Sequence, residues 1–252
     1  MLRSLAAIII VLVAGLSSAI GDTCKPADDH PSAQELVAAF DSHRPRGASA
    51  EIRVRLTMTR KGRERRQEFR ILENGSDSVL VEFLDPQQKG TRVLSVGNTM
   101  WFYSPRTRRA IKIPPIQRVF GDASYGDITQ IRLSDDYEPV SEPCLTQPGD
   151  KDLLKIVLAA KDTAATYQKI VLWVDAADYL PERMEYYVAS GKRLKTAEYP
   201  EAKYIDDKLV IGTWRLFNAN DKSSVTAIET LSYRQIPIPE RQFSRRALES
   251  GR

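Results

Sequence analysis

The strongest constraint on the fold is a run of residues with a period of two. From Glu51 to Thr59 the sequence EIRVRLTMT alternates apolar and polar residues. Successive side chains of a β-strand point to opposite faces, so this run predicts a strand with one buried and one solvent-exposed face. The predicted buried face consists of Ile52, Val54, Leu56 and Met58.

Eleven more strand-like runs are separated by short connections with turn residues. They are Gln67–Glu73, Ser78–Leu84, Arg92–Val96, Thr99–Ser104, Ala110–Ile113, Leu153–Ala159, Lys169–Asp175, Arg183–Val188, Arg193–Tyr199, Val210–Asn218 and Thr226–Tyr233. Lys61-Gly62, Gly97-Asn98, Gly191-Lys192 and Asn220-Asp221 are typical of hairpin turns. Consecutive strands with almost no helix between them predict a mainly β fold with antiparallel pairing, and not βαβ units.

Few segments have helical character. Ser32 can cap a helix and Glu35 completes a capping box, which predicts a helix over Ser32–Phe40. Short helices are also expected near Ile116–Phe120 and at Phe243–Leu248. The proline-rich stretch 138–150 is expected to be a loop.

The first 21 residues resemble a secretory signal peptide. Arg3 precedes an apolar run from Leu5 to Leu16, and small residues follow, so that cleavage after Ala19 or Gly21 fits. The run is shorter than the roughly 20 apolar residues that span a bilayer, although a membrane anchor is the alternative. We expect export, with residues 22–252 forming one β domain of about 230 residues.

The chain is mildly basic, with a formal net charge of +4. This charge suits contact with anionic lipid or an acidic partner, and ordinary surface charge is the alternative. Because we expect export, nucleic-acid binding is not the expected reason for the basic charge. Basic runs at Lys61–Arg66, Arg106–Arg109 and Arg241–Arg246 are either solvated hairpin tips and tail or a docking surface for lipid headgroups or a membrane partner.

The two cysteines, Cys24 and Cys144, are the only ones in the chain. In an oxidising compartment such a pair is a disulfide candidate. A loop this long would contribute on the order of 4–5 kcal/mol in the chain-entropy model. The alternative is two unpaired thiols, with Cys24 in a mobile tail.

No catalytic, cofactor or metal-binding motif is present. The chain has two histidines, His30 and His43, and neither has a metal ligand at a recognisable spacing. Nucleotide-binding fingerprints and a nucleophile elbow are also absent. Asp127, Asp135 and Asp136 could form a carboxylate cluster for acid–base work or calcium binding, but solvated loop charges are the simpler interpretation.

Adjacent aromatic residues in the strand Thr99–Ser104 divide between its faces. Trp101 and Tyr103 share one face, and Met100 and Phe102 share the other. In the simplest interpretation, one of these pairs packs in the hydrophobic core beneath a helix. In a carrier, the concave face of the sheet would instead line a cavity for acyl chains.

Two groups of motifs resemble those of the LolA-like outer-membrane lipoprotein-sorting proteins. The stretch Gly90–Asp127 reads GTRVLSVGNTMWFYSPRTRRAIKIPPIQRVFGDASYGD. It is similar to the family pattern G-T-R-x-L, W-x-Y-x-P, a basic residue with an R/K-I pair, and G-S-D-F-S-Y-E-D. Trp173-Val174-Asp175, Tyr179-Leu180-Pro181, Glu185-Tyr186-Tyr187, Gly191-Lys192 and the ending Ile238–Leu248 match further family motifs. The chain departs from the pattern at Ala123 and Gly126.

The resemblance implies an incomplete, strongly curved antiparallel β-barrel, with helices over its open side and an apolar cavity between them. It implies a periplasmic carrier of lipid or lipoprotein acyl chains in a Gram-negative-type envelope, without enzymatic activity or cofactor. By the same analogy Ser32–Phe40 and Pro114–Asp127 are lid candidates. A monomer is expected, and an inner-membrane transporter of the RND type is a plausible partner.

The candidate residues for lining a cavity or core are apolar and aromatic residues of the predicted strands. They are Ile52, Val54, Leu56, Met58, Phe69, Ile71, Val81, Phe83, Trp101 and Tyr103. Arg92, from the G-T-R motif, could meet a headgroup at the cavity mouth or form a structural hydrogen bond. The alternatives to a carrier are a periplasmic sensor or adaptor that binds a protein with the same fold, and a hydrolase using Asp127 or Asp135.

Overall fold

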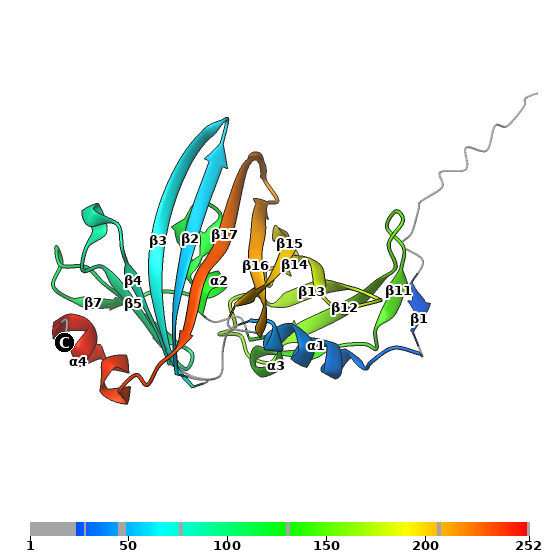
Figure 1. Cartoon of the computed structure of the whole chain (residues 1–252), viewed down its shortest axis with the longest axis horizontal. Coiled ribbons are helices and arrows are strands. Elements are labelled where there is room, and N and C mark those ends of the chain that lie inside the picture. The colour runs from blue at the N-terminus through cyan, green and yellow to red at the C-terminus, as the bar shows by residue number, and fades with distance from the viewer. Residues whose placement is uncertain are drawn as a thin grey trace, which may run out of the picture.

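One large antiparallel sheet dominates the computed structural model (Figure 1). The structure describes residues 24–27, 29–44, 49–75, 78–129, 132–205 and 208–250, except for the side chain of Lys208. The predicted signal peptide lies outside these residues. Among the helices described, none is long and apolar enough to cross a membrane.

The sheet runs in the order β1-β11-β12-β13-β14-β15-β16-β17-β2-β3-β4-β5-β6-β7, and β10 pairs with β12 beside β11. Its first half in the chain contains β1 (Lys25–Pro26), β2 (Ala50–Arg60), β3 (Arg63–Asn74), β4 (Ser78–Phe83), β5 (Arg92–Val96), β6 (Thr99–Tyr103) and β7 (Ala110–Lys112). The second half contains β10 (Tyr137–Pro139), β11 (Cys144–Thr146), β12 (Leu153–Ala160), β13 (Lys169–Asp175), β14 (Pro181–Tyr187), β15 (Arg193–Ile205), β16 (Lys208–Asn218) and β17 (Asp221–Gln235). The separate pair β8 (Arg118–Phe120) and β9 (Ala123–Ser124) forms a small second sheet.

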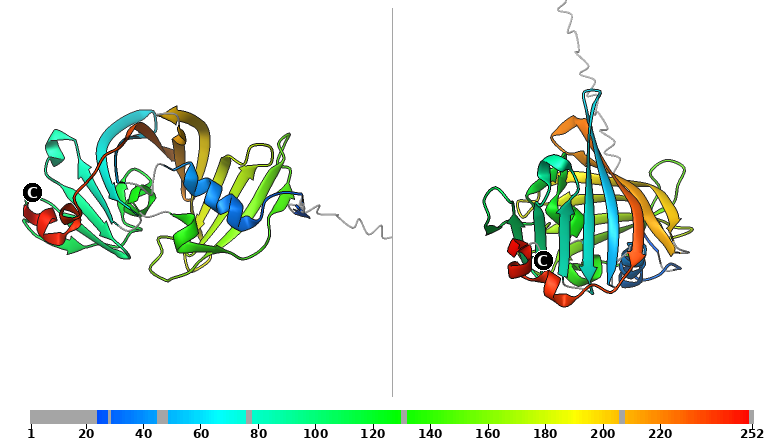
Figure 2. Two further views of the ribbon diagram at one scale, coloured as in Figure 1. Left: turned by 60° about the horizontal axis from the view of Figure 1, so that its bottom comes forward. Right: turned by 60° about the vertical axis from the view of Figure 1, so that its left-hand side comes forward.

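The mainly β, half-barrel fold predicted from the sequence is confirmed. Pairing is antiparallel throughout, and the sheet curves without closing, so that β1 and β7 are its two ends (Figure 2). The hairpin between β2 and β3 turns at Lys61 and Gly62, both of which have positive φ, as a tight type I′ turn requires.

Helices cover parts of both faces. They are α1 (Ala33–Ser42), α2 (Tyr125–Thr129), α3 (Leu133–Asp136), α4 (Arg245–Ser250) and the short 3-10 helices η1 (Pro86–Gln88) and η2 (Glu240–Phe243). The capping box predicted at the start of α1 forms, because Ser32 and Glu35 exchange hydrogen bonds. The terminal helix is also confirmed.

Two local predictions were wrong. Residues 118–120 form strand β8, whereas a helix was expected near Ile116–Phe120. The expected loop 138–150 contains most of β10 and all of β11, which pair with β12. Prolines were taken as loop signals there, but Pro139 is the last residue of β10 and Pro143 comes just before β11, and the missing N–H is tolerated at such strand ends.

Apolar side chains form a core on each face of the sheet. The larger core lies on the concave face, called the inner face here, and gathers side chains from α1, α2 and most strands. The smaller core lies on the outer face of β3–β7, where Leu72, Leu80 and Leu94 pack against Phe243 and Leu248 of the C-terminal segment. This end of the sheet is therefore covered on both faces.

Cys24 and Cys144 form a disulfide, with their Cα atoms 5.3 Å apart. The bond lies where β1 pairs with β11, and Pro26 is opposite Cys144 in the register. The N-terminal segment of the described chain is thereby fixed to the end of the large sheet.

Candidate ligand-binding pocket

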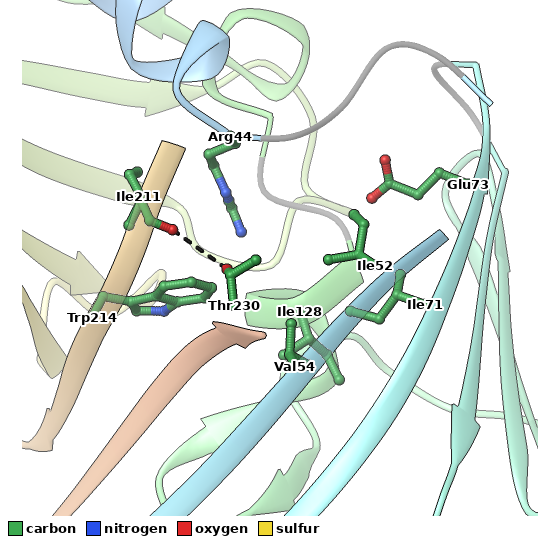
Figure 3. A pocket seen from close by; sticks show the side chains of 9 residues that line it. All are labelled: Arg44, Ile52, Val54, Ile71, Glu73, Ile128, Ile211, Trp214 and Thr230. Atoms are coloured by element: carbon green, nitrogen blue, oxygen red, sulfur yellow. Dashed lines mark hydrogen bonds between the residues drawn. The ribbon is translucent and has the colours of Figure 1, made fainter. Parts of the chain in front are cut away.

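A mainly apolar pocket opens on the inner face between α1, α2 and the middle of the sheet. It encloses about 410 Å³, part of it open to solvent. The residues that line it are Arg44, Ile52, Val54, Ile71, Glu73, Ile128, Ile211, Trp214 and Thr230 (Figure 3). They come from β2, β3, β16 and β17, from α2, and from the residue two positions after α1.

Most walls of the pocket are branched aliphatic side chains, and the polar side chains of Arg44, Glu73 and Thr230 also line it. The guanidinium carbon of Arg44 lies 5.8 Å from the centre of the Trp214 ring. Glu73, on β3, lies at the same end as Arg44 (Figure 3). A pocket with apolar walls and a few polar groups suits a ligand that has an apolar body and a polar head.

Helix α2 forms one wall of the pocket and is held by a buried carboxylate. Asp127, only 2% exposed, accepts hydrogen bonds from Lys195 Nζ at 2.7 Å, from Tyr167 Oη at 2.6 Å and from Ser124 N at 2.7 Å. Lys195 is also buried, and its Nζ donates to Asp122 O at 2.9 Å. The charges are thus paired and hydrogen-bonded on several sides, which is the condition for keeping an ion pair in a protein interior.

The turn before α2 is attached to the sheet by a second set of hydrogen bonds. Asp122 N donates to Thr226 Oγ1 at 2.8 Å, and Ser224 Oγ donates to Asp122 Oδ2 at 2.7 Å. Gly121 has a φ of +55°, and a Cβ at this position would lie 2.3 Å from Thr226 Oγ1. Only glycine allows this backbone to lie so close to β17.

The two departures from the family motif have a structural reason. Ala123 is fully buried, so a larger aromatic side chain has no room there. At Gly126 a Cβ would lie 2.3 Å from Thr166 Oγ1 and 2.6 Å from Thr166 Cγ2. The loop around Thr166 therefore occupies the space that an acidic side chain at position 126 would need.

Tyrosines surround the Asp127–Lys195 pair. The Tyr167 and Tyr186 rings are 4.6 Å apart, and the Tyr186 and Tyr199 hydroxyls are 3.3 Å apart. Burial raises the pKa of Tyr167 well above its usual value, and the charge of Asp127 adds to this effect. Burial also raises the pKa of Tyr186. These phenols are therefore neutral hydrogen-bonding groups in the folded protein.

Helix α1 is joined to α3 through its last turn. Asp41 accepts hydrogen bonds from the backbone N–H groups of Leu133 and Ser134, at 3.0 and 2.8 Å. Near the end of the same helix, the Phe40 ring meets the Tyr199 ring edge to face, with centroids 5.9 Å apart. Both lid candidates, Ser32–Phe40 and Pro114–Asp127, are thus fixed by specific polar contacts at one end.

The residues predicted to line a cavity or core divide into three sets. Ile52, Val54 and Ile71 line the pocket. Leu56, Phe69, Val81 and Phe83 lie on the same inner face but are packed in the large core, and Met58 is half-buried beside Gly121.

The third set lies on the other face of the sheet and is a correction to the predicted cavity lining. Trp101 and Tyr103 pack in the smaller core, whereas Met100 and Phe102 point to the inner face. Arg92 also lies on the outer face, with its guanidinium carbon 5.1 Å from the centre of the Tyr103 ring and its Nη1 3.5 Å from Ala247 O. These contacts are of the kind expected for the structural role of Arg92, and its role at a headgroup stays a prediction.

Sequence reasoning missed Ile128, Ile211, Trp214 and Thr230. Ile211 and Trp214 are three residues apart, and residues three apart point to opposite faces of a regular strand. The β15–β16 register shifts between Glu201 and Ala202, so that Thr213 pairs with Glu201 but Ile211 pairs with Ala202. The residue skipped at this shift is Gly212, and a glycine inside a strand run is the sequence signal for such a bulge. This irregularity brings both side chains to the pocket.

The other charged candidates do not form a chemical site. The interpretation of Asp127 as a solvated loop charge was wrong, because it is buried, while Asp135 pairs with Arg132 at 3.1 Å near the surface. Across the described residues, no three side chains of His, Cys, Asp or Glu gather closely enough to hold a metal ion. In the basic run Lys61–Arg66 all side chains are exposed.

Comparisons with known proteins support the fold. The structure is similar to that of a LolA superfamily protein from Nitrosomonas europaea, with a TM-score of 0.77 and 23% identity, over 85% of this chain and 98% of that one. It is also similar to a DUF1329 family protein from Desulfovibrio piger, with a TM-score of 0.71 and 20% identity, over 89% and 99% of the two chains.

A third similar structure is a domain named as an outer membrane lipoprotein-sorting protein from Vibrio parahaemolyticus. Its TM-score is 0.68 at 20% identity, over 86% of this chain and 97% of that one. No curated protein sequence matches this chain. A family model with the description "Uncharacterized protein" matches residues 75–250. The chain therefore belongs to that family, and its fold is that of the LolA superfamily.

Proposed function

We propose that this chain is a periplasmic carrier that binds an acyl chain of a lipid or lipoprotein in the pocket between α1, α2 and the sheet. The observation that carries the proposal is the lining: Val54, Ile71, Ile128 and Ile211 present aliphatic groups to a partly open space that Arg44 also lines. Export through residues 1–21 and a role without enzymatic chemistry are parts of the same proposal.

Burial is the physical basis for recognising an acyl chain. Each methylene removed from water contributes about 0.8 kcal/mol, so a chain can bind tightly without any specific polar contact. Arg44, the one basic residue among those described in the lining, would then meet the phosphate or carbonyl end of the ligand. This arrangement selects amphiphiles with a long tail over short apolar molecules.

The size of the pocket implies that α2 takes part in loading. The centre of a water molecule can reach only about 30 Å³ of this space, far less than the roughly 300–1,000 Å³ of pockets that enclose drug-sized ligands. Ile128 of α2 points into this space (Figure 3). Displacement of α2 would lengthen the pocket along the inner face, and a cargo that binds the displaced state more tightly would shift the population towards it.

Native mass spectrometry tests the carrier function directly. The processed protein, purified without detergent, should carry a phospholipid or acylated species at near one-to-one ratio, which organic extraction would identify. A protein that is ligand-free and stays so after incubation with envelope lipids would contradict the proposal. Recovery of a stoichiometric protein partner with an empty pocket would favour the adaptor function, with an RND-type transporter as a candidate partner.

Filling the pocket should prevent cargo binding without unfolding the protein. Val54→Phe adds a ring at a position that lines the open space, and we expect at least a tenfold lower lipid occupancy, together with a stability change within the range of about 1–3 kcal/mol that overpacking causes. The measurement is bound lipid per protein by mass spectrometry.

A matched control is Val140→Phe, because Val140 is 57% exposed and is not among the pocket residues. It should leave lipid occupancy unchanged. If a folded Val54→Phe variant carries as much lipid as the control, the pocket between α2 and β16 is not the binding site.

A further inference from the structure

The outer face of β12, β13 and β14 carries basic and aromatic side chains over an apolar floor. Alternation on these strands sends Leu154, Ile156, Leu172 and Met184 to the inner core. Their neighbours on the other face line a shallow groove that encloses about 1050 Å³, much of it open solvent. The lining residues used below are Lys155, Val157, Lys169, Val171, Trp173, Arg183, Glu185 and Tyr187.

Cross-strand register arranges cations around the aromatic rings. Lys155 and Arg183 lie opposite Trp173 on the two neighbouring strands, with their charged ends 5.8 and 5.3 Å from the centre of its ring. Lys169 Nζ is 3.9 Å from the centre of the Tyr187 ring. Each ring is thus held on the floor of the groove beneath basic side chains.

One carboxylate in the centre organises the arginines. Glu185 pairs with Arg183 at 2.5 Å and with Arg193, and it accepts a hydrogen bond from Tyr187 Oη at 2.5 Å. Burial opposes ionisation of Glu185, but hydrogen bonds from Tyr187 and Arg183 outweigh it and lower its pKa. This surface therefore keeps an excess of positive charge around an ionised carboxylate. It is called the basic face here and is defined by Lys155, Lys169, Arg183 and Arg193.

We propose that the basic face docks the protein onto an anionic lipid bilayer. Basic side chains near an anionic membrane surface are each attracted by about 1 kcal/mol, and Trp and Tyr favour the level of the headgroups. Lys155 and Lys169 share the groove with Val157 and Val171, two residues further along the same face of each strand, so their methylenes can stay on apolar surface while their charged ends reach phosphates. The inference does not depend on which cargo the inner pocket binds.

The apolar floor distinguishes the basic face from another basic surface at the β2–β3 turn, where Arg65 also lies over a ring, 5.9 Å from the centre of Phe120. Side chains of Arg60–Arg66 are all exposed, and two of them are paired with carboxylates: Arg60 with Asp221 at 3.1 Å and Arg66 with Glu64 at 3.0 Å. A solvated hairpin tip of this kind attracts anions weakly and without orientation. The basic face combines the charge with amphipathic groups that suit the membrane interface.

Vesicle sedimentation tests the proposal with the processed protein. Binding to phosphatidylcholine vesicles should appear when phosphatidylglycerol is added and should be lost at high salt, which screens surface charge. Lys155→Gln with Lys169→Gln should weaken the partition constant about 30-fold, because two attractions of about 1 kcal/mol each are lost. Trp173→Leu should also weaken binding, although it removes no charge.

The control variant removes the same charge elsewhere. Lys61→Gln with Arg63→Gln, at the hairpin tip, should leave the partition constant within about twofold of that of the unmodified protein. If both double variants lose the same affinity for the vesicles, the proposal is overturned. Binding would then depend on the net charge of the protein and not on this particular surface. Absence of binding to phosphatidylglycerol vesicles at low salt, with circular dichroism showing folded protein, would also overturn it.

Discussion

Asp127→Asn should lower the free energy of unfolding by about 3–5 kcal/mol. Removing one member of a buried ion pair leaves the other charge without compensation, and a loss of this size is typical. Lys195, 4% exposed, would keep the backbone oxygen of Asp122 and the neutral amide oxygen of the new side chain as acceptors, but it would lose its charged partner. Tyr167 would also lose the charged acceptor of its hydroxyl group. Urea unfolding of both proteins measures the difference.

A surface pair of the same kind provides the control. Lys151 and Glu182 are 2.5 Å apart, but their side chains are 61% and 35% exposed. Glu182→Gln should therefore change stability by no more than about 1 kcal/mol, as is usual for exposed pairs. If Asp127→Asn has an effect as small as this control, the buried pair does not hold α2 in place.

The double variant Lys195→Met, Asp127→Asn isolates the interaction of the two charges. Its loss of stability should be smaller than the sum of the losses in the two single variants, because no uncompensated charge remains when both residues are changed. Hydrogen exchange supplies the second measurement: amides of 121–129 should exchange faster in Asp127→Asn, through an opening of lower free energy than that of β12 and β13, whose protection falls only with the global stability. Equal opening free energies in both regions would mean that residues 121–129 open only when the whole domain unfolds.

Most of the sheet could be predicted because its strands obey local rules. Glu51–Thr59 alternates cleanly, and its four apolar residues do point to one face of β2. The strand at Lys169–Asp175 was predicted to the residue, since turn residues bound it on both sides. Alternation and turn chemistry both act over a few residues, and they agree here.

The site could not be predicted in the same way, because it depends on contacts between distant segments. Asp127 and Lys195 are 68 residues apart, and nothing near Asp127 in the sequence indicates a buried partner. Alternation correctly separated Trp101 and Tyr103 from Met100 and Phe102, but it could not say which pair faces the concave side. The C-terminal segment decides this, since Phe243 and Leu248 pack against the outer face and bury Tyr103 there.

Alkaline pH should destabilise the fold through the buried tyrosines. Burial raises the pKa of Tyr125 to about 12, and it raises that of Tyr199 to about 12 as well. An unfolded chain releases these protons near pH 10, so between about pH 10 and 12 the unfolded state is the less protonated one. Stability contributed by each phenol is therefore complete below pH 10 and is lost as the pH rises towards the folded pKa.

The expected loss is at most about 1.4 kcal/mol per pH unit for each such tyrosine, and Tyr167 and Tyr186 act in the same direction. Urea unfolding between about pH 9 and 11 measures the slope, which steepens above pH 10. Near pH 11, Tyr125→Phe should make it shallower by roughly 1 kcal/mol per pH unit, because that residue no longer titrates in either state. An unchanged slope would show that the Tyr125 hydroxyl ionises as readily in the folded protein as in water, which would place it outside the core formed by α2 and the inner face of the sheet.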